Sequence, residues 1–449
     1  MADVLSYELA AIPPSLFDEK NGSMRLSTKS TIKSKLQVEA STRSLSPPDC
    51  IILDGCAVLW VVRWPSKGKV EDYVKSFVDY VENHLRMADT YLVFDRYYER
   101  SIKEGTRKAR AGRDASRRHK LSLSTPLPAQ KVCLTVTENK VQLIDIICQY
   151  LNDYRTNSSH CLVVTGPDPI PLEYFAGDVR AREDLRTTHE EADVIIAQQA
   201  LSLARMNKMV IKVVADDTNI FILLLYIYHT QQLTCDLLMS GTNAARSSSC
   251  IKFTALLNTD ILTHLLPAHI LTGCDTVSYI WGIGKSTVVK ALKTGLTLSK
   301  LGCLQEPMVD VISEATKFIS ACYGYPGETS MTDLRFKVWS NKMGNCKLNL
   351  APDLKVLPPT SKAFEQHVYR AHLQTAIWRS VTSADPPNAN PIHYGWTLDI
   401  DQNVLVPIVL PPDVSPAPMD ILKMIKCGCS KCSTARCSCS VAQISCSVF

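Results

Sequence analysis

The chain has 449 residues, of which 46% are hydrophobic and 21% charged, and its formal net charge is +5. This length is enough for two or three domains, and the composition is that of an ordinary soluble globular protein. The longest apolar run, IFILLLYIY from Ile220, is about half as long as a membrane-spanning helix. The opening residues carry acids and prolines where a secretory signal has an apolar core. We therefore expect an intracellular protein that does not span a membrane.

An alternation of strand-like and helix-like segments begins near Cys50. Five β-branched runs that end in a polar residue or glycine predict buried strands, at 50–55, 90–95, 161–166, 210–216 and 235–241. Amphipathic patterns predict helices between them, at 69–87, 139–155 and 189–207. Strands that alternate with helices indicate an α/β fold with a mostly parallel sheet covered on both faces.

The rest of the chain divides by composition. Residues 1–48 are rich in serine and lysine and are expected to form a leader or loosely docked arm, and 49–325 form the α/β domain with a helical part from about 255. A helical extension follows at 326–405 and includes a helix at 361–381. A proline-rich linker at 406–426 then leads to a cysteine-rich tail at 427–449.

Three of the predicted strands end in acidic residues: Asp54, Asp95, and the pair Asp216 and Asp217. Each has a structural explanation, as a turn, an ion pair or a helix cap. The carboxyl ends of parallel strands share one edge of the sheet, however, and carboxylates gathered there repel one another unless cations bind. Oxygen ligands in this number favour Mg²⁺ or Mn²⁺.

A fourth acidic group lies in the segment THEEAD at the start of a predicted helix. Thr188 and Glu191 have the spacing of a capping box, which would explain them structurally. Alternatively, Glu191 and Asp193 project from the first helical turn toward the same metals. Glu190 also competes with Glu191 for that role, since it shares a helix face with Asp193.

The segment GIGKST, from Gly282, looks at first like a phosphate-binding loop of an ATPase. That loop needs a glycine five residues before Gly284, where this chain has Tyr279. Because tyrosine cannot make the tight turn of that glycine, the ATPase interpretation is weak.

Residues 96–120 contain ten lysines or arginines and three acids. Such a cluster suits phosphate binding or a nuclear import signal, which makes the nucleus the expected location. A solvated helix face explains the charge equally well.

The order of these motifs, LDG, FD before a basic helix, EAD, ADDTN and GCD with GIG, resembles the flap endonucleases, which have a PIN-like fold. The resemblance covers residues 50–295 and implies two metal ions, Mg²⁺ or Mn²⁺, bound by Asp54, Asp95, Glu191, Asp193, Asp217 and Asp275. It implies that Lys103 and Arg110 contact the scissile phosphate. It also implies a helix–two-turn–helix near 271–295 that grips DNA, and DNA contacts from Gly282, Ile283, Gly284, Lys285, Arg107, Arg113, Arg117 and Arg118.

One departure from the family pattern concerns the metal site directly. Asn219 stands where the family has a second aspartate, so one negative charge is lost, although Asp216 offers a replacement. The long N-terminal segment is also foreign to that family.

Six cysteines crowd into the last 23 residues: Cys427, Cys429, Cys432, Cys437, Cys439 and Cys446. Thiolates this dense, interleaved with basic residues, indicate structural Zn²⁺, and an oxidation-prone tail is the alternative. The pattern is similar to half of a tesmin-type CXC domain, which binds DNA. The order of YELAAIPPSLFD, THEEAD, GCD and the cysteine tail also resembles mobile-element-derived proteins of animal genomes.

Together these patterns predict a metal-dependent, structure-specific nuclease that hydrolyses phosphodiester bonds by a two-metal mechanism. The alternative is a PIN-like protein that binds nucleic acid but is catalytically impaired, because Asn219 replaces an aspartate. We expect nucleic acid, most simply DNA, as the partner.

Overall fold

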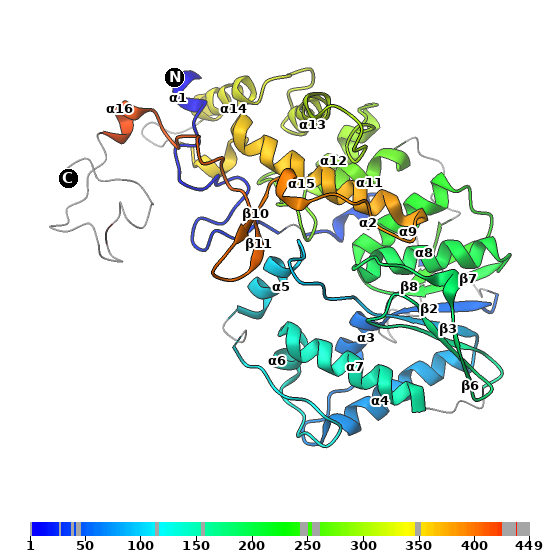
Figure 1. The fold of residues 1–449 in the computed structure, drawn as a ribbon. Coiled ribbons are helices and arrows are strands. Elements are labelled where there is room, and N and C mark those ends of the chain that lie inside the picture. The colour runs from blue at the N-terminus through cyan, green and yellow to red at the C-terminus, as the bar shows by residue number, and fades with distance from the viewer. Residues whose placement is uncertain are drawn as a thin grey trace.

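The computed structural model describes residues 2–26, 28–36, 40–41, 46–112, 116–153, 158–242, 250–253, 261–345, 352–423 and 437. Its centre is a sheet of nine strands in the order β1-β9-β8-β7-β2-β3-β4-β5-β6, with helices on both faces (Figure 1). The strands are β1 (Ala40–Ser41), β2 (Cys50–Asp54), β3 (Asp89–Val93), β4 (Leu162–Thr165), β5 (Leu172–Phe175), β6 (Asp178–Ala181), β7 (Val210–Val214), β8 (Asp236–Ser240) and β9 (Cys250–Lys252).

The parallel centre of the sheet confirms the sequence prediction. All five predicted strands are present as β2, β3, β4, β7 and β8, and each pairs in parallel with its neighbour. The edge strands β5, β6, β9 and β1 pair antiparallel, and the sequence did not reveal them. Strand β6 is exposed along its whole length, so it carries no apolar run by which it could be recognised.

The helices of the described residues are α1 (Ala2–Leu5), α2 (Thr31–Lys35), α3 (Gly55–Val61), α4 (Val70–Leu85), α5 (Glu104–Ala111), α6 (Gln130–Thr135), α7 (Thr137–Asp153), α8 (Ala192–Arg205), α9 (Thr218–Thr230), α11 (Leu262–Leu271), α12 (Lys285–Lys293), α13 (Met308–Cys322), α14 (Met331–Asn345), α15 (Ser361–Arg379) and α16 (Met419–Leu422). The predicted helices at 69–87, 139–155 and 189–207 are α4, α7 and α8. None of these helices is both long enough and apolar enough to cross a bilayer.

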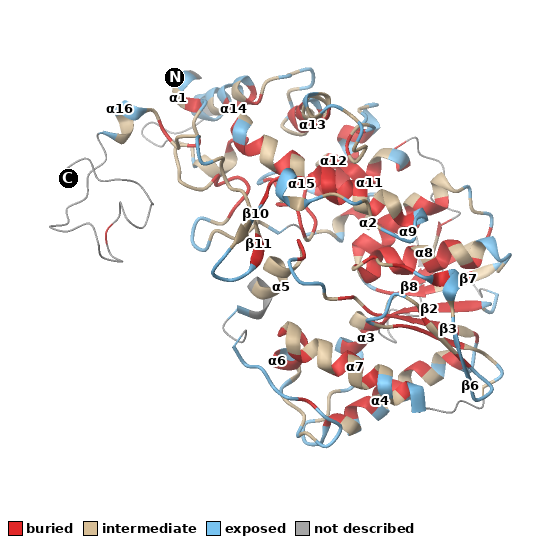
Figure 2. Ribbon diagram, viewed as in Figure 1, coloured by how far each residue is buried: buried red, intermediate tan, exposed pale blue. Residues whose placement is uncertain are grey.

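Side chains alternate between two cores, one on each face of the sheet, because successive residues of a strand point in opposite directions. Ile52 belongs to the core under α8, α9 and α11, whereas Ile51 belongs to the core under α3, α4 and α7. Both cores and the central strands are buried (Figure 2). Helix α9 contains the apolar run from Ile220 and is apolar on all sides because it is enclosed on all sides.

The N-terminal segment packs against the body of the protein more closely than a loosely docked arm. Phe17 and Ile32 are fully buried. The backbone N–H groups of Tyr279 and Trp281 donate to the carbonyl oxygens of Arg25 and Ser15, at 2.7 and 2.9 Å. The first 36 residues therefore contribute to the core of the protein.

The C-terminal extension shares that core as well. Helix α15 packs against α11 and α13, and its Trp378 is buried. A hairpin of β10 (Trp396–Asp399) and β11 (Val404–Pro407) follows, where the sequence predicted the end of the extension and the start of a linker. Strand β11 packs against α5, so this hairpin lies beside the basic segment.

A buried ion pair links the N-terminal segment to α14. Arg335 Nη1 lies 3.6 Å from Glu8 Oε2, and both side chains are fully buried. Arg335 also donates to the carbonyl oxygens of Pro358 and Glu8, and Glu8 Oε1 accepts from the backbone N–H of Thr360 at 2.6 Å. Each charge therefore depends on its partner and on a few fixed hydrogen bonds.

We predict that Arg335→Ala lowers the free energy of unfolding by about 3–5 kcal/mol, because it leaves the Glu8 carboxylate buried without its partner. Denaturant unfolding measures the change. The control is Lys337→Ala, which breaks an ion pair to Glu328 in which the lysine side chain is 52% exposed. That variant should change stability by less than about 1 kcal/mol. A similar small loss in Arg335→Ala would contradict the prediction.

Candidate active site

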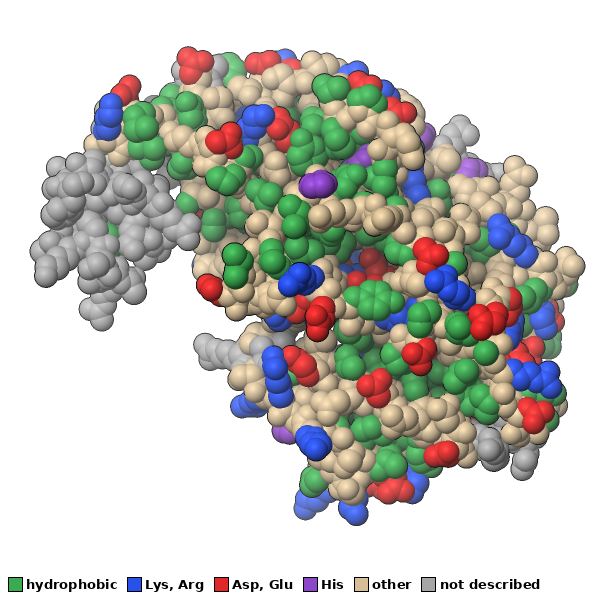
Figure 3. Space-filling model, viewed as in Figure 1, with side chains coloured by type: hydrophobic (Ala, Val, Ile, Leu, Met, Phe, Trp, Pro, Cys, Tyr) green, Lys and Arg blue, Asp and Glu red, His purple; other side chains and the backbone are tan. Residues whose placement is uncertain are grey.

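A cavity of about 490 Å³ opens at the carboxyl ends of the central parallel strands. The face drawn in Figure 3 is hollowed near its centre, and acidic and basic side chains gather there. The charged residues that line the cavity are Asp54, Asp95, Lys103, Arg107, Lys140, Asp193, Asp216, Asp217 and Asp275. The structure thus brings together all the predicted acidic ligands except Glu191, which lies behind the lining.

Three of the aspartates are held by the helices that start at this edge. Asp54 ends β2 and accepts from the Ala57 N–H of α3 at 3.0 Å. Asp217 accepts from the Asn219 N–H of α9 at 2.8 Å. Asp95 follows β3 and accepts from the Ala192 N–H that opens α8, at 2.8 Å. Each carboxylate therefore occupies the positive end of a helix and has one oxygen fixed there.

Asn219 connects two further carboxylates from α8 and from the loop after α11. Its Nδ2 donates to Asp193 Oδ2 at 3.2 Å and to Asp275 Oδ2 at 3.3 Å. Its Oδ1 lies 3.2 Å from Nε2 of His269, which is buried. Burial lowers the pKa of His269 well below its usual value, so the ring is neutral and Nε2–H donates to the amide. Asn219 consequently presents a donor to the carboxylates.

Glu191 is held on all sides by donors. Lys103 Nζ lies 3.0 Å from Oε2, which also accepts from Trp378 Nε1 at 3.0 Å. Gln374 Nε2 donates to Oε1 at 2.9 Å. The Glu191 carboxylate therefore fixes Lys103 between α15 and the cavity.

Glu190 has a separate set of partners. It accepts from Ser101 Oγ at 2.6 Å and pairs with Arg107 Nη1 at 2.7 Å. The predicted capping box is absent, because Thr188 Oγ1 donates to Asp385 at 2.7 Å and α8 starts only at Ala192. Asp95, which follows β3, accepts the hydrogen bond from the first backbone N–H of α8 instead.

The acids are crowded enough to alter one another's ionisation. Burial, together with the charges of Asp95 and Asp217, raises the pKa of Asp54 to about 7. Burial and the charge of Asp217 raise the pKa of Asp193 well above its usual range. Negative charge is therefore in excess around the cavity.

Lysines offset part of that excess. Burial raises the pKa of Asp95, but Lys103 and Lys140 outweigh this effect and bring the pKa below its usual value. Burial would lower the pKa of Lys103, yet the carboxylates of Glu191 and Asp193 raise it well above its usual value. Lys103 is accordingly a permanent cation in this site.

A hard divalent cation suits this donor set, because carboxylate oxygens in number are what Mg²⁺ and Mn²⁺ prefer and because the acids repel one another. Within the described ranges, no group of three or more His, Cys, Asp or Glu side chains is arranged to hold a metal ion as it stands. The carboxylates line an open cavity, so an ion would have to draw them together.

Asp216, the possible substitute for the missing aspartate, has a different partner. Its Oδ2 accepts from Thr242, from the N–H at 3.2 Å and from Oγ1 at 2.5 Å. It lines the cavity but is tied to the segment after β8.

The GIG segment forms a turn before α12. Gly282 has φ +85°, a left-handed conformation that favours glycine, and Gly284 is the N-cap of the helix. Lys285 is buried, and its Nζ donates to His269 O at 2.6 Å, Gly273 O at 2.9 Å and Thr272 Oγ1 at 3.1 Å. In this structure its ammonium group caps α11 and does not reach the surface.

The other predicted contacts are only partly within the described residues. Arg117 is exposed, and Arg118 is 65% exposed and pairs with Glu138 at 2.6 Å. The side chain of Arg110, all of Arg113, and the zinc candidates Cys427, Cys429, Cys432, Cys439 and Cys446 lie outside the described residues. Cys437 is described and is buried.

Sequence reasoning missed Lys29 and Lys140. Lys29 Nζ lies 2.5 Å from Asp275 Oδ1, and Lys140 lines the cavity from α7. Neither is near an acidic motif in the sequence, so no local signal could have identified them. Trp60, 45% exposed on α3, also lines the cavity and was not singled out.

We predict that Lys285→Met lowers the free energy of unfolding by about 1–3 kcal/mol, since it leaves buried oxygens without their donor. Lys290→Met, at an exposed position of the same helix, is the control and should change stability by less than about 0.5 kcal/mol. Thermal unfolding measures both, and DNA affinity is measured on the folded variants. If Lys285→Met is as stable as wild type but has lost DNA affinity, Lys285 contacts a DNA phosphate and its structural role is refuted.

No protein-family model matches this sequence, and no curated protein matches it. Among solved structures, the chain is similar to the T5 D15 protein co-crystallised with metal ions, with a TM-score of 0.37 and 10% identity. It is also similar to the bacteriophage T5 D15 flap endonuclease in a pseudo-enzyme-product complex with DNA and metal ions, with a TM-score of 0.36 and 11% identity. Each match covers 75% of this chain and 91% of the other.

Proposed function

We propose that the protein is a metal-dependent nuclease that hydrolyses phosphodiester bonds, with DNA as its substrate. The observation that carries the proposal is the cavity at the sheet edge, which is lined both by aspartates from separate elements and by basic side chains. Carboxylates bind the divalent ion that such hydrolysis uses, and cations bind the phosphate. Both requirements are met within one cavity of about 490 Å³.

Mg²⁺ or Mn²⁺ is the proposed cofactor. The proposed ligands come from the six predicted acids. Five of them line the cavity, and of these Asp275 is already paired with Lys29, which leaves Asp54, Asp95, Asp193 and Asp217 with the most direct access. A divalent ion held by these carboxylates would supply positive charge to the phosphate oxygens and would lower the pKa of a bound water.

The basic residues neutralise the phosphate. Lys103, held by Glu191, and Arg107, held by Glu190, present fixed cations on one wall of the cavity. Because these side chains are already positioned by ion pairs, little reorganisation is needed when negative charge builds on the phosphate. From the sequence alone, Arg110 is proposed as a further phosphate contact.

Trp60 at the cavity lining offers an aromatic face on which an unpaired base can stack. We further propose that the backbone N–H groups of Gly282 and Gly284 bind a DNA phosphate, whereas the N–H of Ile283 donates to Ile280 O at 3.1 Å. We also propose that Zn²⁺ organises the cysteine tail. These contacts would position DNA without reading its sequence.

We predict that Asp54→Asn lowers the rate of DNA cleavage by at least about 100-fold, since loss of one preorganised electrostatic partner typically costs that much. Labelled 5′-flap, single-stranded and duplex DNA, each with Mg²⁺ or Mn²⁺, provide the assay. Asp178→Asn on strand β6 is the control, because that side chain is 73% exposed and lies outside the cavity lining. Equal cleavage by wild type and Asp54→Asn would refute the assignment.

A protein that binds nucleic acid without cutting it is the second candidate. The observation that favours it is the orientation of Asn219, whose Nδ2 donates to Asp193 and Asp275 where the family pattern has a carboxylate. An amide N–H that donates to the carboxylates stabilises their negative charge, so they depend less on a bound cation.

We predict that Asn219→Asp increases the stabilisation of the protein by Mn²⁺, because it adds a carboxylate to the cluster. Tenfold tighter binding corresponds to an additional stabilisation of about 1.4 kcal/mol at saturating metal. Thermal unfolding with and without Mn²⁺ measures it, and Asn83→Asp, at an exposed position of α4, is the control. The same Mn²⁺ effect in wild type and variant would show that residue 219 does not limit metal binding.

A further inference from the structure

The six acids predicted as metal ligands fall into two classes by their hydrogen bonds. Asp275 and Glu191 have both carboxylate oxygens engaged by side-chain N–H donors. Asp275 Oδ1 contacts Lys29 Nζ at 2.5 Å and Oδ2 accepts from Asn219 at 3.3 Å. Glu191 Oε1 accepts from Gln374, and its Oε2 contacts Trp378 and Lys103.

The other four acids differ in this respect. Asp54, Asp95 and Asp217 each have one oxygen fixed by a backbone N–H at the start of a helix. Asp193 has one oxygen in contact with Asn219 Nδ2. All four line the cavity. The carboxylates with spare oxygen capacity therefore form one group.

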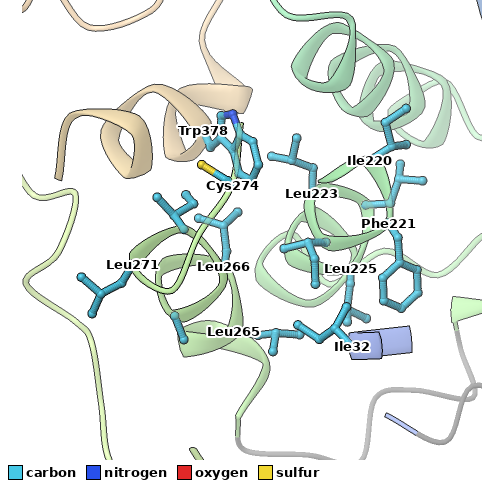
Figure 4. Packing of buried hydrophobic residues seen from close by; sticks show 14 of the residues in the cluster. Ile32, Ile220, Phe221, Leu223, Leu225, Leu265, Leu266, Leu271, Cys274 and Trp378 are labelled. Carbon is cyan, nitrogen blue, oxygen red and sulfur yellow. The ribbon is translucent and has the colours of Figure 1, made fainter. Parts of the chain in front are cut away.

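Lys29 is built into the site by the arm that carries it. Next to it, α2 buries Ile32, which lies near Leu225 and Leu265 in the core (Figure 4). Lys33 Nζ, from the same helix, donates to the carbonyl oxygen of Asp216 at 3.1 Å. The arm thus contacts the acidic edge at two points, and the Lys29 side chain is only 18% exposed.

Lys29 brings a positive charge to the acids. Its ammonium group lies against Asp275 with both side chains largely buried, 18% and 15% exposed. The single positive charge of Lys29 therefore lies beside acids that the sequence predicted to bind two metal ions.

We propose that the Lys29 ammonium takes the place of one of the two divalent ions, so that the site binds one ion among Asp54, Asp95, Asp193 and Asp217. This inference rests on the proposed function. Asn219 has a related effect. Its amide donates hydrogen bonds to both Asp193 and Asp275, whereas an aspartate at this position would add one more carboxylate ligand for a second metal ion. Lys29 is thus a positioning residue, and the N-terminal arm is part of the site.

The test is the number of Mn²⁺ ions bound by the full-length protein without nucleic acid. Free Mn²⁺ is measured by electron paramagnetic resonance during a titration, and calorimetry gives an independent count. The proteins are wild type, Lys29→Met with Asn219→Asp, and Lys35→Met, which removes an exposed lysine of the same arm. We expect one ion for wild type and Lys35→Met, and two for the double variant.

Other results separate this inference from the proposed function. Two ions of comparable affinity in wild type would overturn the inference and leave the nuclease proposal standing. No bound ion in wild type would overturn both. A single ion in the folded double variant would overturn the role of Lys29. If circular dichroism shows the double variant to be unfolded, Lys29→Gln takes its place: a second, weaker Mn²⁺ supports the inference, and an unchanged single ion overturns it.

Discussion

Repulsion among carboxylates at one edge of a parallel sheet is the constraint on which the rest of the site depends. Because β2, β3 and β7 run in the same direction, they bring Asp54, Asp95 and Asp217 to that edge. Helix starts stabilise one oxygen of each, and neighbouring lysines offset some of the charge. Burial, with a further contribution from the charges of Asp95 and Asp217, still raises the pKa of Asp54 to about 7. A site of this kind favours whatever brings positive charge into it, whether a metal ion, a lysine or an amide N–H.

The central strands of the sheet and the location of most of the acids at its edge could be predicted from the sequence for the same reason. Buried parallel strands are continuous apolar runs, and a polar residue marks the point where each strand leaves the core. Both the strand and the acid at its end can therefore be recognised from a short stretch of sequence. The edge strands lack such runs. The N-terminal arm was misjudged because its buried residues, such as Phe17 and Ile32, are separated by polar ones and acquire partners only from distant segments.

The roles of individual charged residues were much harder to predict. Lys285 stands beside the GIG turn in the sequence, yet its ammonium is directed inward to the end of α11. Lys29 gives no local signal, and its partner Asp275 is 246 residues away. A residue type shows which bonds a side chain can make, whereas the choice among partners is made by tertiary packing. For that reason Asn219 looked like a simple loss of a ligand, although the structure gives it three partners.

The ion pairs of the N-terminal arm also have a consequence for the order in which the molecule is made. Arg335 and Asp275 are synthesised hundreds of residues after their partners Glu8 and Lys29. Sheet and flanking helices join segments closer in sequence and are able to fold while synthesis continues. The contacts of Glu8 and Lys29 therefore form only after Asp275 and Arg335 have been synthesised. A chain interrupted before the extension would keep Asp275 but would lack Arg335, the partner of the buried Glu8 carboxylate.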